Sequence, residues 1–87
     1  MSISVKNSAR TEVEVAINKW GDDGKTGFFS IEPEKSETWS RSDDRGFVMS
    51  LQISGTQRPY FVQHNSSIVV HSINHVEDHG IQINPIA

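Results

Sequence analysis

Apolar residues alternate with polar ones over two long stretches of this 87-residue chain. Val13, Val15 and Ile17 are separated by Glu14 and an alanine, and residues 47–53 repeat the same period of two. Because successive side chains of a β-strand point to opposite faces, this pattern is typical of strands with one buried face. A one-residue slip in pairing would expose the whole apolar row, so the pattern constrains both the strand and its register.

Shorter apolar segments elsewhere in the chain predict further strands, separated by turns rich in glycine, proline, serine and aspartate. These segments lie at residues 3–5, 29–31, 38–39, 60–62, 68–73 and 81–83. Residues 21–27, 42–46, 54–57 and 74–80 are predicted to be loops or turns. About eight short strands without an amphipathic helix predict an all-β fold. We expect a single antiparallel β-sandwich domain spanning residues 1–87.

The charge and cysteine content narrow the class of protein. The chain has 8 Lys and Arg against 11 Asp and Glu, a net charge of −3, and its basic residues are scattered singly. A nucleic-acid partner is therefore not expected, because binding to phosphates needs a basic patch. The absence of cysteine favours a reducing compartment. No apolar run resembles a signal peptide or a transmembrane segment, so we expect a cytoplasmic location.

The small size of the domain predicts self-association. A chain of 87 residues buries only a modest core. A sandwich also leaves sheet edges with unpaired backbone groups, which can pair with a second chain. We therefore expect a homo-oligomer, most simply a dimer. Glu12 and Glu14 would oppose such pairing if they lay on an edge strand, because charged side chains protect an edge from a second chain.

Two tryptophans lie beside polar, charged turns and define the candidate binding site. An indole either fills a core or forms a recognition surface. Trp39 lies where a sandwich often buries an indole, whereas Trp20 is out of phase with the apolar row before it. Neighbouring aspartates can accept hydrogen bonds from sugar hydroxyls, and arginines can bind a carboxylate, sulfate or phosphate. The candidate ligand-binding residues are Trp20, Asp22, Asp23, Trp39, Arg41, Asp43, Asp44 and Arg45.

These residues predict a non-catalytic recognition module that binds a glycan or a lipid headgroup. No serine lies in a nucleophile-elbow pattern and no pair of carboxylates has catalytic spacing, so neither enzyme activity nor a cofactor is expected. The alternative is a structural or inhibitory domain that acts through protein contacts as a homo-oligomer. The four aspartates of the two loops could bind calcium if the loops met, but solvated turn acids are the simpler interpretation.

Three histidines spaced by four residues raise a further alternative. His71, His75 and His79 are favoured as exposed turn residues, because the surrounding pattern is strand, turn, strand. A hairpin could still bring His71 and His79 together near Glu77 or Asp78 as metal ligands. That arrangement would suit a small metal-dependent hydrolase, the least favoured class.

Part of the chain resembles a known family. The segments Val13-Glu14-Val15 to Trp20-Gly21, Ile31-Glu32-Pro33 and residues 36–43 are similar to the first half of the fungal aegerolysin and actinoporin-like β-sandwiches. The resemblance covers about residues 3–53. Members of those families are poor in cysteine, often lack signal peptides, and bind membrane lipids or sugars. The resemblance therefore implies a β-sandwich that recognises a glycan or a lipid headgroup.

Overall fold

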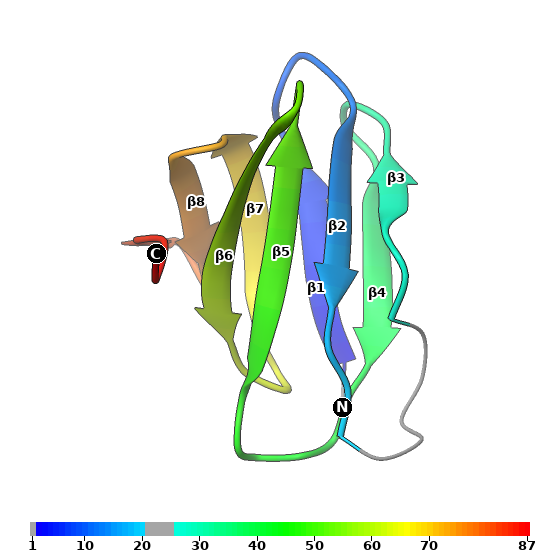
Figure 1. Ribbon diagram of the computed structural model, residues 1–87, viewed down its shortest axis with the longest axis vertical. Helices are drawn as coiled ribbons and strands as arrows, with labels where there is room; N and C mark the ends of the chain where they lie inside the picture. Colours follow the sequence, from blue (N-terminus) through cyan, green and yellow to red (C-terminus); the bar gives the residue numbers. More distant parts are fainter. Residues whose placement is uncertain (1, 21–25) are drawn as a thin grey trace.

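The computed structural model describes residues 2–20 and 26–87, which form two β-sheets stacked face to face (Figure 1). The described residues contain strands and turns but no helix. The strands are β1 (Ser2–Asn7), β2 (Val13–Ile17), β3 (Phe29–Ile31), β4 (Ser36–Ser40), β5 (Phe47–Ile53), β6 (Thr56–Val62), β7 (Ser67–Ser72), β8 (His75–Asp78) and β9 (Ile81–Ile83). This arrangement confirms the predicted all-β sandwich.

The front sheet of Figure 1 has the strand order β3-β2-β5-β6, and the back sheet has the order β4-β1-β7-β8-β9. All neighbouring strands are antiparallel except β1 and β7, which run parallel with Val5 opposite Ile68. The expectation of a purely antiparallel sandwich was therefore wrong at this one pair. Parallel strands cannot be joined by a tight hairpin, and here the whole front sheet and β4 lie between β1 and β7 in the chain.

The core lies between the sheets and is built from the alternating apolar rows. Val13, Val15 and Ile17 of β2 face it, as the sequence predicts, and each is fully buried. Trp39 is also fully buried, and its ring meets that of Phe29 edge to face, with centroids 6.2 Å apart. Burial of such a side chain stabilises a fold by about 1.5–3 kcal/mol. The other core residues are Ile3, Val5, Ile31, Phe47, Met49, Leu51, Tyr60, Val62, Ile68, Val70 and Val76.

The structure corrects two predicted turns. Residues 74–80 contain β8, whose Val76 is buried, and the turn to β9 is shorter than expected. That turn is made by His79 and Gly80, both with positive φ, as a tight β-hairpin requires. Residues 56–59, predicted to be a turn and its exit, belong to β6. Pro59 is tolerated there because β6 is the edge of the front sheet, and its carbonyl accepts a hydrogen bond from the Ile86 amide outside the sheet.

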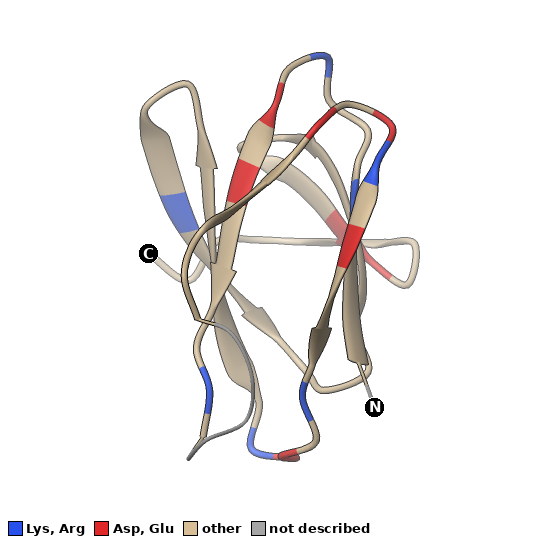
Figure 2. Ribbon diagram, turned by 90° about the vertical axis from the view of Figure 1, so that its right-hand side faces the viewer, with Lys and Arg blue, Asp and Glu red and all other residues tan. Residues whose placement is uncertain are grey.

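Charged side chains are spread over the side of the sandwich that carries β3 and β4. Figure 2 marks both acidic and basic residues along the described part of the ribbon on this side. One contact between opposite charges joins Lys6 of β1 to Glu34 in the β3–β4 turn, at 3.8 Å. This distribution agrees with the scattered basic residues of the sequence.

Candidate functional site

Residues 18–20, which follow β2, and the loop between β4 and β5 lie at the same end of the sandwich (Figure 1). The indole nitrogen of Trp20 donates a hydrogen bond to the Gly46 carbonyl, at 2.9 Å. The guanidinium of Arg45 lies over the Trp20 ring, 3.6 Å from its centroid, which is the geometry of a cation–π contact. These two segments are thus joined around Trp20, whose side chain remains exposed.

Arg45 is held in place by Asp43. Its Nε and Nη2 atoms donate to the two carboxylate oxygens of Asp43 at 2.9 and 2.6 Å, and its backbone amide donates to Oδ1 at 2.9 Å. The side-chain hydrogen bonds from Arg45 lower the pKa of Asp43 from 3.8 to about 2. In return, the Asp43 carboxylate raises the pKa of Arg45. The hydrogen bonds therefore hold the guanidinium of Arg45 and the carboxylate of Asp43 in place beside the exposed indole of Trp20.

The stability that Asp43 contributes should depend on pH in a narrow acidic range. Because its folded pKa lies below the unfolded value, the contribution is present above pH 3.8 and is lost as the pH falls toward 2. Arg45→Ala should return the pKa of Asp43 toward 3.8, because the hydrogen bonds that lower it are removed. An NMR titration of the carboxyl carbon measures both values. Arg58→Ala, on β6, should leave the pKa of Asp43 unchanged, and a wild-type value near 3.8 would refute the pairing.

Two predicted ligand-binding residues are buried and cannot contact a ligand on the surface. Trp39 is 0% exposed and belongs to the core. Arg41 is 1% exposed, and its guanidinium donates to the carbonyls of Ile17, Asn18 and Ser40 at 2.8–2.9 Å. The Trp39 ring and the Arg41 guanidinium thus make their contacts within the fold.

Of the remaining predicted residues, two are described by the structure near Arg45 and two are not described. Asp22 and Asp23 lie outside the described residues. Asp43 is partly buried in its pair with Arg45, and Asp44 is exposed beside it. The alternative of a calcium site at the four aspartates therefore depends on two residues that lie outside the described part of the chain.

Two apolar residues that the sequence did not mark as functional complete the surface at this end. Val48 and Phe61 are directly paired across β5 and β6, and their side chains are 38% and 47% exposed. The Phe61 ring lies against Gly46, where a Cβ atom would clash with it. Trp20 also contacts Gly46 through its hydrogen bond, so both aromatic side chains lie against this glycine. We call Trp20, Val48 and Phe61 the aromatic face.

The sequence contains only a weak indication that these residues form an exposed surface. Val48 has the opposite parity to the buried residues of β5, so it was expected to point away from the core. Which residues of other strands would lie beside it depends on pairing between strands, and no local pattern reveals that register.

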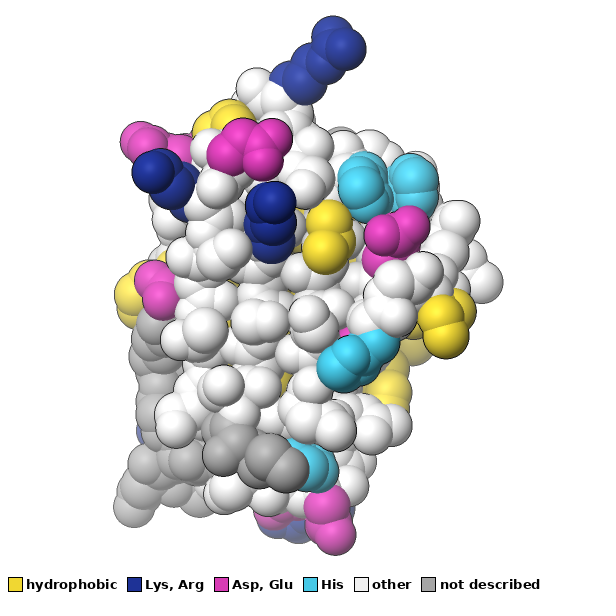
Figure 3. All heavy atoms as spheres, turned by 180° about the vertical axis from the view of Figure 1, so that it is seen from behind, with side chains coloured by type: hydrophobic (Ala, Val, Ile, Leu, Met, Phe, Trp, Pro, Cys, Tyr) yellow, Lys and Arg dark blue, Asp and Glu magenta, His cyan; other side chains and the backbone are white. Residues whose placement is uncertain are grey.

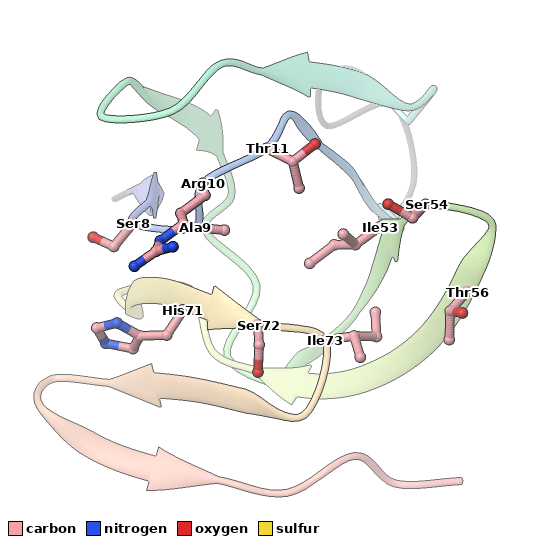
Figure 4. A pocket seen from close by; sticks show the side chains of 10 residues that line it. All are labelled: Ser8, Ala9, Arg10, Thr11, Ile53, Ser54, Thr56, His71, Ser72 and Ile73. Carbon is pink, nitrogen blue, oxygen red and sulfur yellow. The ribbon is translucent and has the colours of Figure 1, made fainter.

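An open cavity of about 560 Å³ lies at the opposite end of the sandwich. Figure 4 shows Ile53 and Ile73 pointing into it, with the charged or titratable side chains of Arg10 and His71 at one side. Its volume is within the range of small-molecule sites. The residues that line it are Ser8, Ala9, Arg10, Thr11, Ile53, Ser54, Thr56, His71, Ser72 and Ile73.

The structure brings two of the three candidate metal-binding histidines together. His71 and His75 share the Glu77 carboxylate, and the three ligand atoms lie within 4.8 Å of one another. His79 lies elsewhere, with Nε2 3.0 Å from the Asn65 carbonyl oxygen. The alternative in which a hairpin brings His71 and His79 together is therefore not formed, because β8 separates these two residues by its full length.

Comparison with known proteins identifies no relative: no protein-family model matches the chain, and no curated protein or solved structure is significantly similar to it. The resemblance of residues 3–53 to aegerolysins thus stays a prediction. Within residues 2–20 and 26–87, no helix is long and apolar enough to cross a membrane.

Proposed function

We propose that this protein is a non-catalytic recognition module that binds a glycan at the aromatic face. One observation carries the proposal: Trp20 and Phe61, 38% and 47% exposed, both contact Gly46, the residue that precedes β5. Exposed aromatic side chains that lie together on a rigid element are typical of recognition surfaces. Glycans suit such a surface because one side of a sugar ring is apolar and stacks on aromatic groups.

The aromatic face is held in position before any ligand arrives. Val48 and Phe61 are fixed by the β5–β6 pairing, and the Trp20 ring is fixed by its hydrogen bond to Gly46. Side chains that are already ordered lose little conformational entropy on binding, so more of the contact energy appears as affinity. This rigidity suits the weak individual contacts that a sugar ring offers.

The Asp43–Arg45 pair gives this surface a polar border. Arg45 lies over Trp20, and its charge is balanced by Asp43. Remaining oxygen lone pairs of Asp43 can accept hydrogen bonds from sugar hydroxyls. A balanced pair and a net charge of −3 offer no general attraction to anionic lipid, which favours a glycan over a phospholipid headgroup.

Replacing either ring of the aromatic face should weaken glycan binding. We expect Trp20→Ala and Phe61→Ala each to reduce affinity about tenfold or more, because the lost stacking is worth at least about 1.4 kcal/mol. A glycan array identifies the ligand, and calorimetry with the best sugar measures the loss. Ile81→Ala is the matched control: Ile81 is 70% exposed on β9 of the other sheet, so the variant should bind normally.

A parallel panel of lipid vesicles separates the remaining interpretations. Binding to sugars but not to vesicles supports the proposal, whereas binding to vesicles alone would assign the surface to a lipid headgroup. If both assays fail and light scattering shows a dimer that Phe61→Ala dissociates, the aromatic face is instead an interface between two copies. Turnover of any glycoside or ester by the intact chain would contradict the non-catalytic assignment.

A further inference from the structure

A second cluster of chemically active side chains lies on the back sheet, near the turn between β7 and β8. His71 comes from β7, and His75 and Glu77 come from β8. Figure 3 shows that two histidine side chains adjoin an acidic one on this face. The cluster is separate from the aromatic face, which lies on the front sheet at the other end of the sandwich.

A β-bulge explains why His71 lies beside His75. The pairing of β7 with β8 is regular up to Val70 opposite Val76, and then shifts so that Ser72 lies opposite His75. His71 is therefore the extra residue of the bulge. Bulges re-aim a side chain, and here the imidazole rings of His71 and His75 come to 4.5 Å between centroids. Glu77 follows His75 by two residues, so both point to the same face of the strand.

The distances between these side chains match those between ligands of one metal ion. The Nε2 atom of His71 is 3.2 Å from one carboxylate oxygen of Glu77, and the Nε2 atom of His75 is 3.7 Å from the other. An ion with bonds of about 2.0–2.2 Å to nitrogen and oxygen needs ligand atoms separated by roughly 3–4 Å. Small rotations of three surface side chains would suffice to close the site.

We propose that His71, His75 and Glu77 form a binding site for Zn²⁺. Two imidazoles and one carboxylate are ligands that suit zinc, whereas calcium and magnesium prefer sites made of oxygen alone. The side chains of the three ligands are 37%, 49% and 29% exposed, so water can occupy the fourth position. By the general order of divalent affinities, Cu²⁺ should bind the same three residues more tightly.

The charges around the three ligands influence how tightly they bind a cation. Arg10 lines the same cavity as His71, and its positive charge opposes the binding of a cation. Glu77 supplies the only negative charge among the three ligands. The affinity should therefore depend on all three residues together, and loss of any one of them should be measurable.

Calorimetry with ZnCl₂ and the untagged chain tests the proposal directly. We expect one bound ion per chain, and about a tenfold or greater loss of affinity in His71→Ala, His75→Ala and Glu77→Gln. His79→Ala is the matched control, because His79 is an exposed histidine of the same hairpin region outside the cluster, and it should change the affinity less than about twofold. NMR signals of the His71 and His75 rings should shift on titration, while that of His79 should not.

A second measurement distinguishes loss of zinc binding from misfolding of the variants. Zn²⁺ should raise the melting temperature of the wild type, because a ligand that binds only the folded state stabilises it. The increase should vanish in the double variant His71→Asn/His75→Asn, whose circular dichroism should remain that of the wild type. Absence of zinc binding at millimolar concentration, or an equal loss in His79→Ala, would overturn the proposal.

Discussion

Arg41→Ala should lower the free energy of unfolding by about 3–5 kcal/mol, because it removes one partner from a buried network of charged hydrogen bonds. The guanidinium of Arg41 donates to the carbonyls of Ile17 and Asn18, at the end of β2, and to that of Ser40, at the end of β4. It also lies 5.9 Å from the centre of the Phe47 ring. Alanine would leave buried carbonyls without these donors and create a cavity beside the core.

Urea unfolding followed by circular dichroism measures this loss. A domain of this size has a total stability of about 4–13 kcal/mol, so the loss should be a large fraction of the total and easily measured. Arg41→Lys keeps the charge but cannot donate in the same fork, and it should fall between the wild type and alanine. Arg45→Ala, an exposed arginine of the same loop, should change stability little. Equal effects of Arg41→Ala and Arg45→Ala would contradict the buried role.

Gly46→Ala should destabilise the fold by about 2–3 kcal/mol and weaken glycan binding at the same time. Gly46 has a φ of +95°, a conformation that side chains with a Cβ atom rarely adopt. A Cβ atom there would also clash with the Phe61 ring. Because Phe61 is exposed, its ring should turn outward, which would move it away from Gly46 and break up the aromatic face.

Gly55→Ala is the matched control for this prediction. Gly55 has a φ of +82°, but nothing lies within 4 Å of the position that its Cβ atom would take. This variant should therefore lose stability through backbone strain alone and keep the wild-type affinity for sugar. If the two variants bound sugar equally well, the contact between Gly46 and Phe61 would have no part in recognition.

The fold was largely predictable because its determinants are local. Alternation in β2 and β5 placed the buried faces of both strands correctly, and the turn residues marked most of their ends. The prediction was wrong where tertiary position outweighs local preference. Pro59 is compatible with β6 only because that strand is an edge, and β8 is short and mostly polar, so it has almost no apolar pattern of its own.

The candidate sites were only partly predictable, because they depend on contacts between distant residues. The sequence marked Trp20 and Arg45 as candidates, but it also marked Trp39, for which burial was the favoured interpretation, and Arg41; the structure buries both. Composition cannot distinguish an arginine that is exposed on a loop from one that is buried and donates hydrogen bonds to backbone carbonyls.

The sequence by itself determined that this chain forms strands, which side of the longest strands is buried, and that it has no basic patch or cysteine chemistry. The first two properties follow from the period-two alternation of apolar residues, which is visible within a few consecutive residues, and the third follows from composition. Only the tertiary structure decided that Phe61 lies opposite Val48 and His71 beside His75, through the β5–β6 register in one case and a bulge in the other. Register and bulges arise from the free energy of the whole sandwich, so no single segment encodes them.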